Sequence, residues 1–272
     1  MDSLSLTHVL TLGLGALIGL ALALTGAGGG ILAMPLLILA LHLTVVQAAP
    51  IALLAVGLSA ALGALLAFRQ QQLRYRAAAL IGGVGVLVAP TGTWLAHQIP
   101  VLPMTLVFAA VLAAVAIRMI REAAPGAAAI TPDRSLPCVQ DGDRGRLQWT
   151  APCARALIGT GALSGLLSGA LGVGGGFVIV PALARYTNLT ARSVVGTSLA
   201  VIALVSAGSV TVAALSGHLL WPLALPFAGG AALGTAAGSR LAGRIAPGRL
   251  KQAFGLLSLL AAAIMVQRAW AS

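Results

Sequence analysis

The chain has 272 residues, of which 59% are hydrophobic and only 8% charged, and its net charge is +11. Soluble domains carry about 25% charged residues, so this composition excludes a soluble globular protein and predicts an all-α polytopic membrane protein. We interpret the basic excess as the topology signal of cytoplasmic loops rather than as a surface for nucleic acid. The N-terminus has no basic region before its first apolar segment, so we expect no cleaved signal peptide.

Ten apolar segments follow one another along the chain, and one polar stretch divides them five and five. The first five cover about 8–24, 31–42, 46–68, 77–97 and 102–120, and the last five about 155–171, 177–186, 193–215, 221–242 and 250–268. We therefore predict a first membrane repeat (1–120), a linker (121–154) and a second membrane repeat (155–272).

The two halves repeat each other around a glycine-rich motif. "LTGAGGGILAMPLL" (24–37) returns as "ALGVGGGFVIVPAL" (170–183), at an offset of 146 residues. The same offset relates further glycines and a proline, which is the pattern of an internal duplication. The matched pairs are Gly15 and Gly161, Gly19 and Gly165, Gly26 and Gly172, Gly28 and Gly174, Gly29 and Gly175, Gly30 and Gly176, and Pro35 and Pro181.

The segments that follow the glycines are too short to cross a bilayer. A spanning helix needs about 20 apolar residues, whereas 31–42 and 177–186 have far fewer. Each glycine motif is therefore either a kink in one long helix or the tip of a re-entrant hairpin made of two helices.

The distribution of basic residues favours the re-entrant hairpin. With two hairpins, fifteen of the sixteen Lys and Arg residues fall on one side and only Arg268 falls opposite. With two spanning helices the split is ten to six, which the positive-inside rule disfavours. We expect two inverted halves in the cell (inner) membrane, each with a re-entrant pair and three transmembrane helices, both termini outside and the linker in the cytoplasm. Cys138 and Cys153 in the linker are expected to be free thiols, as in a reducing compartment.

A glycine break in a membrane helix exposes backbone donors. The helix that restarts presents free N–H groups and the positive end of its dipole, and two such ends facing one cavity make an anion site. Nearby hydroxyl groups could assist, although a lone Ser or Thr often bonds its own helix instead. The G-x-x-x-G pairs Gly15/Gly19 and Gly165/Gly169 are better explained by close helix packing. The predicted substrate-binding residues are Gly28, Gly29, Gly30, Gly174, Gly175, Gly176, Thr25, Thr197 and Ser198.

Several classes of chemistry have no residues to support them. Of the five acidic residues, one lies near the N-terminus and four lie in the linker (121–154). No carboxylate in the membrane could therefore bind Na⁺ or relay protons. No Walker motif, hydrolase constellation or metal-ligand cluster occurs, and the glycine run lacks the strand and acidic residue of a dinucleotide fingerprint. We expect no enzymatic activity, no cofactor and no metal.

The paired "GAGGGILAMPLL" and "GVGGGFVIVPAL", with "ARSVVGTSLAV" after the second, resemble the TauE/SafE sulfite exporter family, which includes sulfonate uptake permeases. The resemblance covers both halves and leaves out only 121–154. The first half departs from it, because "PIALLAV" (50–56) replaces the G-T-S triplet, so hydroxyl groups come mainly from the second half. The resemblance implies transport of small sulfur-containing anions, with substrate and direction differing among members.

The sequence thus predicts a secondary transporter of a small anion, sulfite or a related sulfur oxyanion or organosulfonate, bound between the two breaks with alternating access. Its expected partners are this anion and the lipid bilayer, without nucleic acid, and a homodimer stays open. Two alternatives also stay open: a non-transporting membrane subunit or sensor, and a transporter of a different small solute. A metal ion is disfavoured as that solute, because no Cys, His or carboxylate cluster lies at membrane depth.

Overall fold

The computed structural model describes residues 2–25, 30–41, 43–122, 137–139, 149–217, 219–241 and 247–271. These residues form ten α-helices and no strand, one for each predicted apolar segment. Five of the described helices are long and apolar enough to cross a membrane, which confirms an all-α polytopic membrane protein. The first half contains α1 (Asp2–Thr25), α2 (Ala33–Leu41), α3 (Val45–Arg69), α4 (Tyr75–Gln98) and α5 (Val101–Glu122), and the second contains α6 (Ala151–Leu171), α7 (Gly176–Tyr186), α8 (Ala191–Leu215), α9 (Trp221–Leu241) and α10 (Pro247–Ala271).

Threonine side chains cap the N-termini of α3, α6 and α8. Thr44 accepts a hydrogen bond from the N–H of Gln47 at the start of α3, and the Gln47 side chain accepts from the Thr44 N–H. Thr190 caps α8 in the same way through Ser193, at the offset of 146. Such caps satisfy orphan N–H groups at a helix start, so both halves begin a long central helix by the same device.

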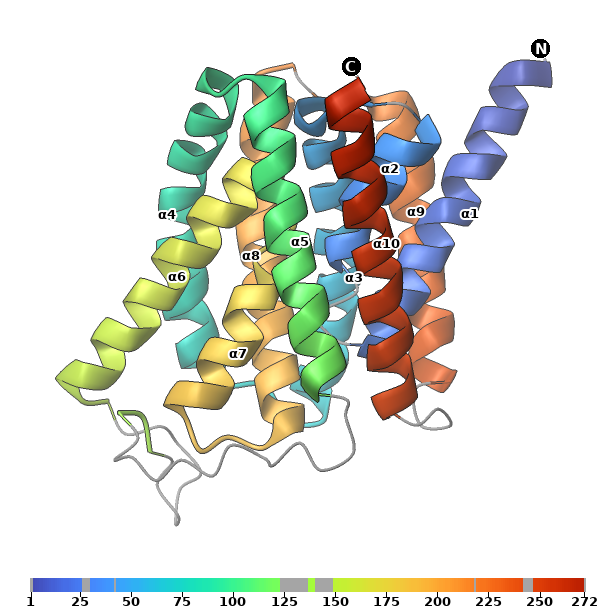
Figure 1. Cartoon of the computed structure of the whole chain (residues 1–272). Helices are drawn as coiled ribbons and strands as arrows, with labels where there is room; N and C mark the ends of the chain where they lie inside the picture. The colour runs from blue at the N-terminus through green and yellow to red at the C-terminus, as the bar shows by residue number, and fades with distance from the viewer. Residues whose placement is uncertain are drawn as a thin grey trace.

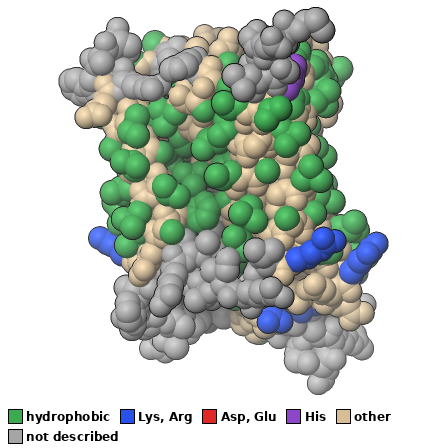
Figure 2. Space-filling view, turned by 90° about the vertical axis from the view of Figure 1, so that its right-hand side faces the viewer, with side chains coloured by type: hydrophobic (Ala, Val, Ile, Leu, Met, Phe, Trp, Pro, Cys, Tyr) green, Lys and Arg blue, Asp and Glu red, His purple; other side chains and the backbone are tan. Residues whose placement is uncertain are grey.

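Both chain termini lie at one end of the helix bundle, and the last turn of α5 and the first turn of α6 lie at the opposite end (Figure 1). We call these the termini end and the linker end. Arginine side chains gather in a band near the linker end, whereas a histidine marks the termini end (Figure 2). Hydrophobic side chains cover the face between them (Figure 2). One end of the molecule is therefore basic, as the charge count predicts.

Glycines bring α1 onto α9 and α6 onto α4. A Cβ on Gly15 or Gly19 would collide with the α9 backbone at Phe227 or Ala231. A Cβ on Gly161, Gly165 or Gly169 would collide with the α4 backbone at Ile81, Gly85 or Ala89. Close backbone approach of this kind is typical of small residues in membrane helices, so the packing role predicted for these G-x-x-x-G pairs is confirmed. The offset of 146 that relates the glycines also relates their partners.

The chain turns back on itself between α6 and α7. Eleven residues of helix would separate Ser164 from Gly175 by about 16 Å, yet the Ser164 hydroxyl lies 3.5 Å from the Gly175 carbonyl oxygen. The far ends of the two helices are also brought together. Cys138 pairs with Thr187, just after α7, and is joined to Cys153 in the first turn of α6. The second glycine motif is therefore the tip of a helical hairpin and not a kink.

The prediction that Cys138 and Cys153 are free thiols was wrong, because the structure joins them in a disulfide. The two cysteines are 15 residues apart in sequence, but the backbone around Cys138 runs against the end of α7, beside the start of α6. The proximity that the fold creates could not be read from spacing alone. Free thiols therefore no longer support a cytoplasmic linker, and the cytoplasmic position predicted for the linker now depends on the arginines.

Candidate functional site at the glycine breaks

The second break holds its backbone in a conformation that suits glycine. Gly172, Gly174 and Gly175 have φ values of 66°, 71° and 68°, in the left-handed region that other residues rarely adopt. The Gly172 N–H donates to the Ser168 carbonyl oxygen and ends α6, while the Gly175 carbonyl oxygen accepts from the N–H groups of Val178 and Ile179 and starts α7. The glycines therefore reverse the chain within four residues.

This reversal leaves a row of backbone donors at the start of α7. Among the described residues, no hydrogen-bond partner is found for the N–H groups of Gly174, Gly175, Gly176 and Phe177. They form the N-terminus of an 11-residue helix, where the dipole adds partial positive charge. Buried backbone N–H groups are almost always paired, so these donors are suited to an anionic acceptor.

The two breaks meet at one valine in the middle of α3. A Cβ on Gly30, at the start of the turn into α2, would lie 3.0 Å from one Val56 methyl group, and a Cβ on Gly174 would lie 3.3 Å from the same methyl group. Gly174 also faces Ile202 of α8, which the offset of 146 relates to Val56. The described parts of both motifs thus converge at the centre of the bundle, where α3 crosses α8.

Hydroxyl groups surround the second break but not the described part of the first. Ser164, Ser168 and Ser206 are fully buried, and the Ser206 oxygen lies 3.5 Å from the position of a Cβ on Gly174. In the part of the chain that the structure describes, the hydroxyl groups of Ser168, Ser206 and Ser209 have no hydrogen-bond partner. The first half has Leu22 and Ala60 at the positions equivalent to Ser168 and Ser206, so these two hydroxyl groups have no counterpart in the first half.

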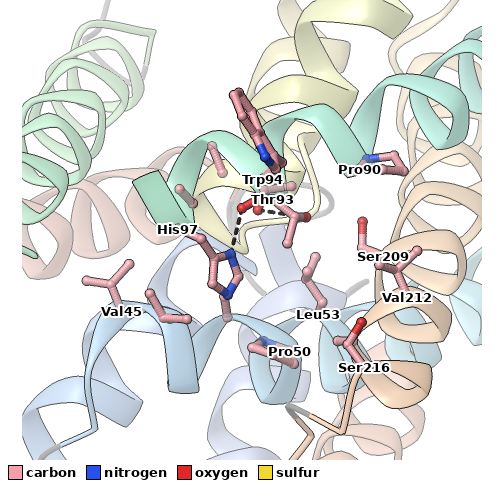
Figure 3. A pocket seen from close by; sticks show the side chains of 16 residues that line it. Val45, Pro50, Leu53, Pro90, Thr93, Trp94, His97, Ser209, Val212 and Ser216 are labelled. Atoms are coloured by element: carbon pink, nitrogen blue, oxygen red, sulfur yellow. Dashed lines mark hydrogen bonds between the residues drawn. The ribbon is translucent and has the colours of Figure 1, made fainter. Parts of the chain in front are cut away.

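A pocket of about 270 Å³ leads toward this break from the termini end. Its wall is formed by the first turns of α3, the last turns of α4 and α8, and the end of α6 (Figure 3). Most of the lining is apolar, with Thr93, His97, Ser209 and Ser216 as polar members. The pocket reaches Gly169 and Ala170, immediately before the break, so it forms a vestibule between the molecular surface and the second glycine motif.

The equivalent place at the linker end is filled by packed side chains. Leu199 of α8 sits against Gly63 of α3, with a methyl carbon 2.8 Å from the position of a Cβ on that glycine. One turn away, Ala67 packs on Gly196 at the same distance. Thr197 accepts a hydrogen bond of 3.2 Å from the Arg74 N–H, which ties α8 to the turn between α3 and α4. In the described part of the chain, α3 and α8 thus pack directly on each other toward the linker end, whereas the pocket lies toward the termini end.

Comparison with known proteins identifies the fold's relatives. The family described as Sulfite exporter TauE/SafE matches residues 11–265. This chain belongs to the TauE/SafE sulfite exporter family. Two proteins named "Probable membrane transporter protein", from two strains of Xylella fastidiosa, are 31% and 32% identical to it, each over 97% of both chains. No solved structure matches the chain. TauE/SafE proteins are membrane transporters, so the chain is a membrane transporter and not an enzyme.

In this TauE/SafE chain the predicted site residues fall into three groups. Gly30, Gly174, Gly175 and Gly176 lie at the central convergence of the breaks. Gly28 and Gly29 lie outside the described residues, and of Thr25 only its place as the last residue of α1 is described. Thr197 and Ser198 lie about one helical turn toward the linker end from Ile202.

Thr197 and Ser198 already have hydrogen-bond partners. Thr197 accepts from the Arg74 N–H at 3.2 Å, and the Ser198 hydroxyl donates to the Val194 carbonyl oxygen at 2.7 Å, within its own helix. Their role in substrate binding stays a prediction. The serines that lie closer to the break on α8, Ser206 and Ser209, were missed. The sequence could have indicated them through their spacing, because positions 206 and 209 follow Ile202 by four and seven residues and so share its face of α8.

Proposed function

We propose that this transporter moves a small sulfur oxyanion or organosulfonate, such as sulfite, across the membrane by alternating access. The observation that carries the proposal is the row of N–H groups at the start of α7 that have no hydrogen-bond partner among the described residues, buried at the centre of the bundle beside Gly30 of the first break. Helix N-termini bind anions without a formal positive charge. The family's name and the resemblance of both glycine motifs support sulfur oxyanions as the class of anion.

An inverted duplication is part of the proposal. The exchanged contacts, α1 with α9 and α6 with α4, support it because they obey the offset of 146. Binding between repeats of opposite orientation lets the protein open toward each side in turn. The substrate would bind at Gly28–Gly30 and Gly174–Gly176, with Thr25, Thr197 and Ser198 near its route.

A substrate panel tests this function. The purified protein is placed in liposomes, and uptake of sulfite, thiosulfate, sulfate, taurine and a small arylsulfonate is measured against protein-free liposomes. We expect saturable flux of at least one sulfur oxyanion or sulfonate and none of a monovalent cation. Binding of sulfite without flux would instead favour a sensor or a non-transporting subunit, and absence of both would overturn the proposal.

A further inference from the structure

Two serines of α8 and the serine that caps its C-terminus form a stripe that runs from the mouth of the vestibule to the second break. Ser206, Ser209 and Ser216 are three and seven residues apart, a spacing that puts them on one face of a helix. From Ser216 to Ser206 the stripe covers about 15 Å along the helix axis. In the pocket, Ser209 and Ser216 lie across from His97 of α4 and near Pro50 and Leu53 of α3 (Figure 3).

The inner two serines differ from the other hydroxyl residues of the same helix. Thr211 donates to the Ala207 carbonyl oxygen at 2.8 Å, and Ser198 bonds its own helix as well, which is the common behaviour of Ser and Thr in helices. Ser206 and Ser209 are 0% and 6% exposed, yet their hydroxyl groups have no partner. A buried hydroxyl group without a partner costs free energy, so an acceptor supplied by a ligand would be stabilised there.

The stripe continues the vestibule to the backbone donors of the break. Ser209 lines the pocket, and Ser206 lies about one turn deeper, with its oxygen 3.5 Å from the position of a Cβ on Gly174. From the side of α6, the buried and unpaired hydroxyl of Ser168 precedes the pocket residue Gly169. Hydroxyl groups thus lie all along the way from the pocket to the N–H groups of α7.

We propose that Ser209, Ser206 and Ser168 bind the oxygen atoms of the substrate on its way between the vestibule and the break, and that the substrate is a sulfonate with a small apolar substituent. This inference rests on the proposed function. The donors are all neutral, because residues 156–184 and 193–239 contain no Lys or Arg, so each oxyanion contact is weak enough to be exchanged for the next. The apolar lining, which includes Val45, Leu53 and Val212, accommodates the substituent.

The concentration dependence of flux in liposomes tests the path. Removal of a hydroxyl bonded to a charged acceptor changes affinity by about tenfold or more, so we expect Ser206→Ala and Ser209→Ala each to raise KM for a small arylsulfonate about tenfold. Ser209→Thr keeps a hydroxyl group at the wall of the vestibule, so its KM should stay near the wild-type value. Ser258→Ala is the matched control: Ser258 is buried, also has no hydrogen-bond partner and lies on α10, which packs on α5, α1 and α2, so its KM should stay unchanged.

The outcomes separate this path from the proposed function. If the wild-type protein transports sulfonates and both alanine variants keep its KM, the path is wrong and the transport function stands. If the wild-type protein transports no sulfur oxyanion at all, the proposed function itself fails. An equal KM for sulfite and arylsulfonate would mean that the apolar lining does not contribute to binding, and would overturn the apolar substituent as part of the proposal.

A labelling experiment covers the case in which Ser206→Ala does not fold. Ser209→Cys and Ser216→Cys are treated, in membranes, with a thiol reagent that carries a sulfonate group, and both native cysteines are held in their disulfide. We expect modification of both positions, slowed severalfold by arylsulfonate. Modification of Ser216→Cys alone, without protection, would mean that a lipid chain fills the vestibule and would overturn the path.

Discussion

Gly174 is constrained both by its backbone and by its neighbours. Its φ of 71° is strained for any other residue, and an added Cβ would lie 3.1 Å from Ile202 and 3.3 Å from Val56. Ser164 blocks the next position more strongly, since its oxygen occupies the place that a Cβ on Gly175 would take. Two of the three consecutive glycines, Gly174 and Gly175, are therefore required by their backbone conformation and their neighbouring atoms, beyond close helix packing.

We predict that Gly174→Ala slows substrate flux about tenfold, because a left-handed conformation costs a non-glycine residue about 1–2 kcal/mol and about 1.4 kcal/mol is a factor of ten in rate. The measurement is initial flux in liposomes at saturating and limiting substrate. Gly159→Ala is the control, since nothing lies within 4 Å of a Cβ at that α6 position. Equal flux in both variants would mean that the break is not part of the site.

At the level of elements, the α6–α7 hairpin is tied at both of its ends. At the tip, Ser164 meets Gly175, and at the base the Cys138–Cys153 disulfide and the Cys138–Thr187 pairing connect the start of α6 with the end of α7. The two helices meet the bundle differently, α6 through glycines on α4 and α7 against α8. The base of the hairpin therefore depends on a segment that precedes it in the chain.

We predict that Cys153→Ser lowers the melting temperature of the detergent-solubilised protein by several degrees. A disulfide that closes a loop of about 15 residues contributes up to about 3 kcal/mol in the chain-entropy account. Reduction should lower the melting temperature of the native protein by a similar amount and leave Cys153→Ser unaffected. Unchanged melting after complete reduction, shown by thiol titration, would contradict the prediction.

The sequence predicted the helices, because hydrophobic periodicity and segment length are local properties. It did not predict contacts between segments that are distant in the sequence. All ten apolar segments gave helices within a few residues, because hydropathy and helix length in a bilayer are local properties. The short segment 177–186 indicated the α6–α7 hairpin, whereas the tip before 31–42 lies outside the described residues. The disulfide was missed because Cys138 reaches Cys153 only through its pairing beside the end of α7, and Ser206 was missed because its place beside Gly174 depends on how α8 crosses the bundle.

For the whole molecule, the end at which the arginines gather bears on its orientation. Arg69, Arg121 and Arg185 lie in the last turns of α3, α5 and α7, which all end at the linker end (Figure 1). The positive-inside rule assigns that end to the cytoplasm. The vestibule at the termini end would then open to the outside, and the packed contacts of Leu199 and Ala67 would close the cytoplasmic side.

We predict that reporter fusions after Gln70 and after Thr187 both report the cytoplasm in cells. Position 70 follows α3 and position 187 follows α7, so the two reporters must agree if the second motif is re-entrant. A fusion at the C-terminus should report the opposite side. A reporter at Thr187 that disagrees with the one at Gln70 would contradict the hairpin in the membrane, whichever side each one names.

The separation of charge from the apolar helices also has an electrical consequence. Residues 3–68, 77–117, 156–184, 193–239 and 252–267 contain no Lys, Arg, Asp or Glu, so no charged side chain moves through the membrane field when the helices rearrange. The voltage then does work on the substrate alone, about 2.3 kcal/mol per elementary charge per 100 mV. For the proposed anion, moved without a coupling ion, the number of charges per turnover would equal the valence of the anion, and an inside-negative potential would drive it outward.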